Sequence, residues 1–136
     1  MNLKDLRIMV VDDNGNMRQL ITTILTAVGI TRIVEVASGA DALSRLAVDK
    51  PDVLLVDYVM DGMTGVELTA RIRAEIDGPG ERLPIVMLTG YSELWRLTEA
   101  KAAGADEFLV KPFTTKALLT RIHRVVGGSE KAEPAA

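Results

Sequence analysis

Four short apolar runs in this chain each end in a polar residue that can take part in chemistry. The runs span residues 8–11, 53–56, 85–88 and 108–110, and the residues that follow them are Asp12, Asp57, Thr89 and Lys111. Apolar runs of this length, rich in branched side chains and separated by helical patterns, are typical of buried parallel strands. The carboxyl ends of parallel strands open on one edge of a sheet, where ligands bind. We therefore expect these polar side chains to converge in one site.

The length and composition are those of one compact domain. With 136 residues, of which 48% are hydrophobic, the chain can bury a substantial core. We predict a single domain over residues 1–127 and a disordered tail over the small and polar residues 128–136.

Charge and residue usage exclude several classes of protein. The formal net charge of -3 and the scattered basic residues give no reason to expect nucleic acid as a partner. The absence of cysteine excludes disulfides and thiolate metal sites. Residues 1–5 lack a signal-peptide pattern, and no apolar run has membrane-spanning length. We therefore expect a cytoplasmic protein that does not insert into a membrane.

Helical periodicity follows the first apolar run. Apolar residues recur at three- and four-residue spacing after Asp13 and predict a helix whose buried face holds Met17, Leu20, Ile21, Ile24 and Val28. Gly29 is expected to end this helix in a left-handed conformation. Residues 33–36 alternate in part with polar side chains, as expected for an edge strand.

Capping residues mark the remaining helices. Ser38 is expected to begin the second helix, and Thr64 with Glu67 to form a capping box for the third. The fourth helix is expected to open at Ser92 and to close near Gly104. Five strands and five helices in strict alternation predict a doubly wound α/β fold around a parallel sheet, with right-handed crossovers.

The three acidic residues of the expected site need a cation. Two carboxylates about 4 Å apart repel by roughly 4 kcal/mol at an effective dielectric constant of about 20, so Asp12, Asp13 and Asp57 are unfavourable together. Oxygen ligands without a histidine favour a hard divalent ion, and we expect Mg²⁺ with several retained waters. The alternative, that an acid merely caps a helix, stays open for Asp13 taken alone.

Lys111 and Thr89 complete a cradle for a tetrahedral anion. Phosphoryl transfer requires a metal and a cation that neutralise the phosphoryl oxygens, with a nucleophile in line with the leaving group. Asp57, at the end of the expected central strand, is the candidate nucleophile, and its product would be an aspartyl phosphate.

These motifs resemble those of the receiver domains of two-component response regulators, and the chain is similar in length to the CheY-like single-domain members. The resemblance spans about residues 5–126 and rests on four motifs: Val11-Asp12-Asp13, Asp57 with Met60 and Gly65, Leu88-Thr89-Gly90, and Lys111-Pro112-Phe113. It implies a flavodoxin-like fold with strand order 2-1-3-4-5.

The resemblance also implies a role for each residue of the site. Asp57 accepts the phosphoryl group, and Asp13, Asp57 and the backbone carbonyl of Val59 bind Mg²⁺. Asp12 acts on the metal mostly through water. Lys111 pairs with phosphoryl oxygens, and its peptide bond to the following proline is cis, a form that proline makes accessible.

A switch that links the site to a partner surface is implied as well. Thr89 binds the phosphoryl group and, by moving, draws Phe108 inward from an outward rotamer. Phe108 then couples the site to the face formed by the fourth helix, the fifth strand and the fifth helix. The alternative is that Phe108 is only a core residue of its strand.

The chain departs from the family pattern beside the phosphoacceptor. Many receivers have proline where this chain has Asp61, whose carboxylate either tunes metal affinity or, as we favour, points to solvent. Val59 and Tyr91 occupy positions that border the path of hydrolytic water in the family. We hypothesise that both side chains slow the loss of the phosphoryl group.

Two further residues are candidates for partner contacts. Trp95, the only tryptophan, is either part of the core or an anchor for a partner, since Leu94 and Leu97 are expected to serve the buried side of its helix. Arg18 lies near the buried face of the first helix, where a histidine kinase or phosphotransfer protein is expected to dock.

The sequence therefore predicts a single-domain response regulator that catalyses only its own phosphorylation and slow dephosphorylation. Its expected partners are a histidine kinase or phosphotransfer protein and an unidentified downstream protein, and we expect a monomer or a phosphorylation-dependent dimer. A phosphorelay intermediate that passes the phosphoryl group onward is an open alternative. A pseudo-receiver that binds partners without phosphorylation is disfavoured by the intact acidic and basic residues. A phosphatase is disfavoured because Val59 stands where it needs a second acid.

Overall fold

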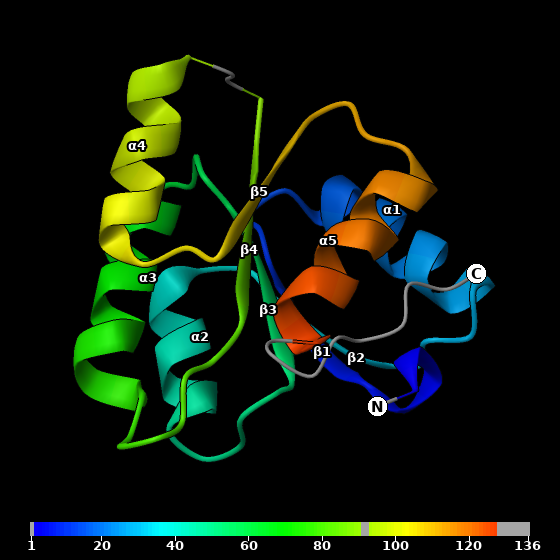
Figure 1. Ribbon diagram of the computed structural model, residues 1–136, viewed down its shortest axis with the longest axis horizontal. Coiled ribbons are helices and arrows are strands. Elements are labelled where there is room, and N and C mark those ends of the chain that lie inside the picture. The colour runs from blue at the N-terminus through cyan, green and yellow to red at the C-terminus, as the bar shows by residue number, and fades with distance from the viewer. Residues whose placement is uncertain (1, 91–92, 128–136) are drawn as a thin grey trace.

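The sheet that carries the site is parallel and five-stranded. The computed structural model describes residues 2–90 and 93–127, and Figure 1 shows the sheet in the middle of the molecule. Its strands are β1 (Arg7–Val11), β2 (Arg32–Val36), β3 (Val53–Asp57), β4 (Ile85–Thr89) and β5 (Glu107–Val110). They pair in the order β2-β1-β3-β4-β5, which confirms the implied strand order and places β2 at an edge.

Helices cover both faces of the sheet. They are α1 (Gly15–Ala27), α2 (Gly39–Leu46), α3 (Gly65–Arg71), α4 (Leu94–Ala103) and α5 (Thr115–Gly127). One face carries α1 and α5, and the other carries α2, α3 and α4 (Figure 1). The doubly wound fold predicted from the alternating pattern is confirmed. The pattern does not predict a short 3₁₀ helix at Leu3–Asp5 or a π-helical segment at Ile72–Ile76 that continues α3.

Some sequence-based predictions concern residues outside the described part of the chain. These are the tail at residues 128–136, the opening of the fourth helix at Ser92 and the role of Tyr91. Within residues 2–90 and 93–127, no helix combines the length and the apolar character that a membrane crossing requires.

The sheet is buried on both faces, which explains why its strands appear in the sequence as continuous apolar runs. All five residues of β3, the central strand, are buried. Leu54 and Val56 pack with residues of α2, α3 and α4, whereas Val53 and Leu55 pack with residues of α1 and α5. Because β3 packs against both helical layers, this packing sets the position of its last residue, Asp57, at the edge of the sheet.

The local signals for helix ends are confirmed. The Thr64 hydroxyl accepts a hydrogen bond from the Glu67 amide, and the Glu67 carboxylate accepts one from the Thr64 amide, which is the reciprocal pair of a capping box. The side chain of Ser38 caps α2. Gly29 has a φ value of 96°, the left-handed conformation expected after α1, and Gly104, near which α4 was expected to close, has a φ value of 114°.

Two leucines that the sequence places on buried helix faces are exposed. Leu20 of α1 is 49% exposed and Leu94 of α4 is 78% exposed. The buried residues of α1 are Ile21 and Leu25, and Leu20 lies roughly a third of a turn away from the middle of that face. Leu94 lies roughly a third of a turn from Ala100, the buried residue of α4. Both predictions are wrong because spacing does not specify which of two adjacent stripes faces the sheet.

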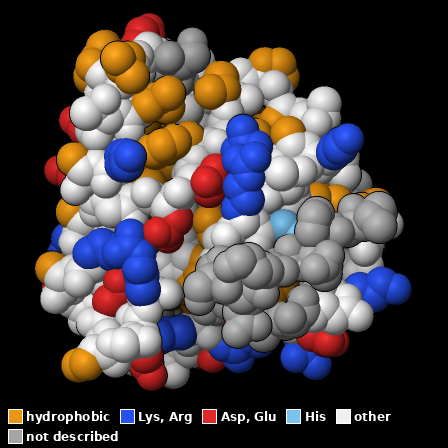
Figure 2. All heavy atoms as spheres, viewed as in Figure 1, with side chains coloured by type: hydrophobic (Ala, Val, Ile, Leu, Met, Phe, Trp, Pro, Cys, Tyr) orange, Lys and Arg blue, Asp and Glu red, His pale blue; other side chains and the backbone are white. Residues whose placement is uncertain are grey.

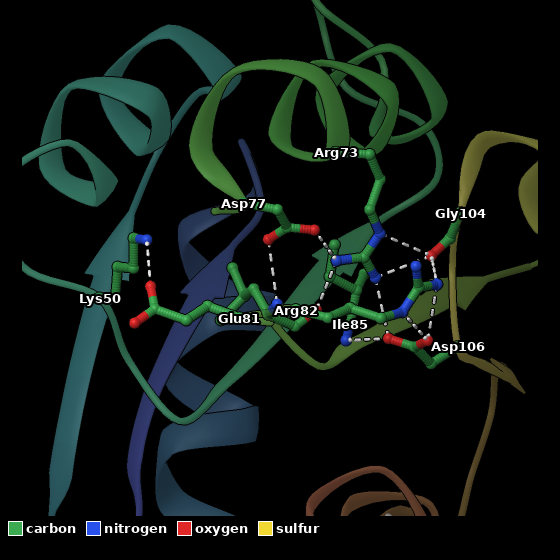
Figure 3. Close-up of polar contacts among 9 residues, drawn as sticks. Lys50, Arg73, Asp77, Glu81, Arg82, Ile85, Gly104 and Asp106 are labelled. Atoms are coloured by element: carbon green, nitrogen blue, oxygen red, sulfur yellow. Dashed lines mark hydrogen bonds and ion pairs between the residues drawn. The ribbon is translucent and has the colours of Figure 1, made fainter. Parts of the chain in front are cut away.

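An ionic cluster ties the amino-terminal edge of the sheet to α3 and α4 (Figure 3). The guanidinium of Arg73, in the π-helical segment, donates to the carboxylates of Asp77 and Asp106 at 2.9 Å each. It also donates to the carbonyl oxygens of Leu83, at 2.7 Å, and Gly104, at 2.8 Å and 3.1 Å. The Arg73 side chain is only 13% exposed, so these contacts are largely shielded from water. The cluster therefore holds the end of α4 at Gly104.

We expect Arg73→Met to lower the free energy of unfolding by about 2–4 kcal/mol, because it leaves two largely buried acids without this cation. Urea denaturation followed by circular dichroism measures the change. Arg71→Met is the matched control, because Arg71 makes an exposed ion pair with Glu75. Equal losses in the two variants would show that the cluster has no special role.

Candidate functional site

The carboxyl ends of four strands bring the expected site residues together. Asp57 and Thr89 are the last residues of β3 and β4, and Asp12 and Lys111 directly follow β1 and β5. Asp12, Asp57 and Thr89 are buried, with 1%, 7% and 2% of their surface exposed. The convergence inferred from the strand-end pattern is present in the fold.

Three carboxylates form the acidic half of the site. One oxygen from each of Asp12, Asp13 and Asp57 lies within 4.8 Å of the other two. Oδ1 of Asp12 accepts a hydrogen bond from the Asn14 amide at 2.9 Å, whereas Oδ2 is buried and has no hydrogen-bond partner within the described part of the chain. A buried carboxylate oxygen without a donor is costly unless a cation contacts it. The donor set therefore fits a hard divalent ion such as Mg²⁺.

A hydrogen bond from the loop that follows β3 holds the Asp13 side chain. Its Oδ2 accepts a hydrogen bond from the backbone amide of Asp61 at 2.8 Å. Proline, which many receivers have at position 61, could not make this bond because it lacks an amide hydrogen. Asp61 itself is exposed, which is consistent with a carboxylate directed to solvent.

An ion pair joins the acidic half of the site to β5. Nζ of Lys111 lies 2.7 Å from Oδ1 of Asp57. The Lys111 amide also donates to the Thr89 carbonyl oxygen at 2.7 Å, which ties the loop after β5 to the end of β4. The peptide bond between Lys111 and Pro112 is cis, as the resemblance implied.

Burial raises the pKa of both Asp57 and Asp12 above the ordinary value of an aspartate. Lys111 opposes the rise of the Asp57 pKa by pairing with the ionised form, and the Asn14 amide opposes the rise of the Asp12 pKa. Neighbouring carboxylates add to both pKa shifts. A cation at this edge would remove part of the electrostatic cost.

Phe108 lies on β5 beside a surface hollow. Its half-buried ring packs against the core on the side of the sheet that carries α2, α3 and α4. It also borders a cavity of about 490 Å³, whose lining includes Leu97, Pro112, Phe113 and Ala117. Figure 2 shows apolar side chains gathered over α4 and toward α5 on this face. Both interpretations of Phe108, as a switch or as a core residue, stay predictions.

The other predicted residues lie around this centre. Val59, whose carbonyl is expected to bind the metal, lies just after β3 and is 52% exposed. Trp95 is 59% exposed in the first turn of α4, which argues against the core interpretation. The Arg18 guanidinium contacts Glu35 at 3.3 Å and the Asp12 carbonyl oxygen, so its charge is engaged within the chain.

One contact beside the site has no counterpart in the sequence pattern. Tyr58, the residue after Asp57, is 8% exposed and donates its hydroxyl hydrogen to the Glu99 carboxylate of α4. The guanidinium of Arg96 lies 5.7 Å from the centre of the Tyr58 ring. Glu99 is 41 residues away from Tyr58, and no spacing rule links the two positions.

Known proteins are similar to this chain in both sequence and architecture. A family model described as the response regulator receiver domain matches residues 8–123. The chain is 35% identical over 120 residues to the chemotaxis protein CheY of Pseudomonas aeruginosa, covering 88% of this chain and 95% of that protein. The solved structure of Vibrio cholerae CheY4 is similar, with a TM-score of 0.77 and 32% identity over 88% of this chain and 98% of that one. So is a receiver domain of a P. aeruginosa sensor histidine kinase with a magnesium ion coordinated in its active site cleft, with a TM-score of 0.79 and 29% identity over 90% and 98% of the two chains.

A side chain at Gly65 is expected to displace α3 from the end of β3. A Cβ there would clash with the Asp57 carbonyl oxygen, and the Gly65 amide donates to the Tyr58 carbonyl oxygen at 3.1 Å. We expect Gly65→Ala to lower the free energy of unfolding, measured in urea, by about 1–3 kcal/mol. Gly78→Ala is the control, because a Cβ there meets only Glu81, at an ordinary 3.6 Å. A loss at Gly65 no larger than at Gly78 would contradict the close approach.

The raised carboxyl pKa values predict a pH dependence of stability without metal. Between the ordinary and the raised pKa of Asp12, the folded state holds more protons than the unfolded state, so its contribution to the unfolding free energy falls as pH rises. Asp12→Asn removes this group. With a chelator present, we expect the variant and the wild type to have the same free energy of unfolding in acid. Near neutral pH the variant should have the higher free energy of unfolding, as measured by urea denaturation. A difference that does not grow with pH would refute the assignment.

Proposed function

The chain belongs to the response regulator receiver domain family and is a CheY-like receiver of two-component signalling, and we propose that it takes up a phosphoryl group on Asp57 in a Mg²⁺-dependent reaction. The observation that carries the proposal is the Lys111–Asp57 pair at 2.7 Å beside the buried Asp12 oxygen that has no hydrogen-bond partner in the described part of the chain. A structural ion pair alone has no need of that second carboxylate. A phosphoacceptor that works with a metal does.

Asp57 is the proposed nucleophile. One of its carboxylate oxygens forms a bond to phosphorus while the bond from phosphorus to the donor breaks, and the electron pair of that bond leaves with the donor. Lys111 pairs with an oxygen of the transferred group, since its ammonium group already lies within hydrogen-bonding distance of Asp57. Asp13 and the Val59 carbonyl would hold Mg²⁺ together with the nucleophile, and Asp12 would act on the ion mostly through water. When bound, the ion would supply positive charge to the phosphoryl oxygens.

Thr89 and Phe108 link the phosphoryl group to a partner surface. The Thr89 hydroxyl binds a second phosphoryl oxygen and moves toward it, and Phe108 follows. The cavity between α4 and α5 that Phe108 borders then changes shape. An unidentified downstream protein binds this face, with the exposed ring of Trp95 as an anchor.

The proposed phosphodonor is a histidine kinase or a phosphotransfer protein, the partners with which receiver domains interact. It docks at α1 and the neighbouring loops, where Arg18 contacts the Asp12 carbonyl oxygen. Val59 and Tyr91 slow the loss of the phosphoryl group, and Asp61 acts through its backbone amide. We place the protein in the cytoplasm, as a monomer or a phosphorylation-dependent dimer.

Onward transfer of the phosphoryl group is a second candidate function. It is favoured by the likeness to a receiver domain that is part of a sensor histidine kinase, with a TM-score of 0.79. Mixing the phosphorylated chain with purified phosphotransfer proteins separates the two functions. Transfer of the phosphoryl group onto a histidine of those proteins supports a relay, and retention of the phosphoryl group on Asp57 supports terminal output.

We expect acetyl phosphate to phosphorylate the wild-type chain only when Mg²⁺ is present, as followed by intact mass spectrometry. Asp57→Asn should abolish the modification because it removes the nucleophile. Lys111→Met should slow it by about tenfold or more, since a cation is lost from the transition state. Arg71→Met, which removes only an exposed ion pair with Glu75, should react at the wild-type rate. An unchanged rate in Asp57→Asn, or in chelator, would exclude this mechanism.

A further inference from the structure

A hydrogen bond ties the residue beside the phosphoacceptor to α4. The hydroxyl of Tyr58 donates to Oε1 of Glu99, which lies midway along α4. The Tyr58 backbone is fixed too, because its amide donates to the Leu88 carbonyl oxygen at 2.8 Å and its carbonyl accepts from the Gly65 amide at 3.1 Å. A displacement of the end of β3 therefore reaches Glu99.

The guanidinium of Arg96 lies close to both Tyr58 and the exposed tryptophan. The guanidinium carbon of Arg96 is 5.7 Å from the centre of the Tyr58 ring and 4.3 Å from the centre of the Trp95 ring. Both distances lie within the range of cation–π attraction. A change on the Tyr58 side of Arg96 therefore alters the surroundings of Trp95.

The opposite end of α4 is held in place. The carbonyl oxygen of Gly104, the residue that ends α4, accepts hydrogen bonds from the guanidinium groups of Arg73 and Arg82 (Figure 3). The helix has 10 residues and is roughly 15 Å long. With the Gly104 end fixed, a displacement applied at Glu99 is largest at the end that carries Trp95.

We propose that Tyr58 and Glu99 couple the phosphorylation state of Asp57 to the orientation of α4, so that phosphorylation changes the surroundings of Trp95. This inference rests on the proposed phosphorylation of Asp57. It adds a connection to α4 that is separate from Thr89 and Phe108. A phosphoryl group brings roughly one to two additional negative charges to the residue before Tyr58, which displaces the end of β3 and attracts Arg96. The charge-assisted hydrogen bond to Glu99 has a buried donor and transmits the displacement.

The chain contains its own reporter, because Trp95 is the only tryptophan. The full-length protein is incubated with acetyl phosphate and Mg²⁺, the extent of phosphorylation is measured by intact mass, and Trp95 fluorescence is recorded on the same samples. We expect the emission of the wild type to change on phosphorylation. At an equal extent of phosphorylation, Tyr58→Phe and Glu99→Ala should each reduce that change by about half or more. Glu75→Ala, which removes an exposed ion pair with Arg71, should keep the full change.

The outcomes separate this inference from the proposed function. A phosphorylated wild type with unchanged emission overturns the coupling and leaves the proposed function intact, and so do variants that keep the full change. A wild type that is not phosphorylated overturns the proposed function and the coupling with it. Circular dichroism shows whether each variant is folded. Glu99→Ala, at an exposed position, keeps the test decisive if Tyr58→Phe loses its fold.

Discussion

The balance of charge at the carboxyl edge of the sheet is the constraint on which the site depends. Burial raises the pKa of Asp12 and of Asp57, and nearby carboxylates make each of them harder to ionise. Lys111 offsets part of this cost from a distance of 2.7 Å. A divalent cation would offset more of this cost, which is consistent with the proposed uptake of a phosphoryl group at this edge.

The two cores maintain this electrostatically unfavourable arrangement. Because β3 is buried on both faces, Asp57 cannot withdraw from its acidic neighbours without disturbing the packing. Backbone hydrogen bonds hold the adjoining loops, from the Asp61 amide to Asp13 and from the Lys111 amide to the Thr89 carbonyl oxygen. At the opposite edge, hydrogen bonds from Arg73 hold the end of α4 at Gly104. The site and the contact with α4 are therefore built on the same sheet.

Features that depend on one turn of chain are predictable from the sequence. The capping box at Thr64 and the glycine end at Gly104 are confirmed because each is made by residues a few positions apart. The predictions for Leu20 and Leu94 are wrong because periodicity defines an apolar stripe without specifying how the helix is rotated against the sheet. The apolar runs identify the strands, whereas their order in the sheet came from the resemblance to receivers, since a run carries no information about its neighbours.

Local pattern was enough to identify the chemistry available to this chain. Carboxylates, a hydroxyl and an ammonium group stand at the ends of four of the five strands, and parallel strands open on a common edge. Two features are visible only in the packed structure. An Asp12 oxygen has no hydrogen-bond partner among the described residues, and Tyr58 contacts Glu99, 41 residues further along. Both features depend on the register of the strands and the rotation of the helices. Those are set by close packing of the whole core, which no short stretch of sequence encodes.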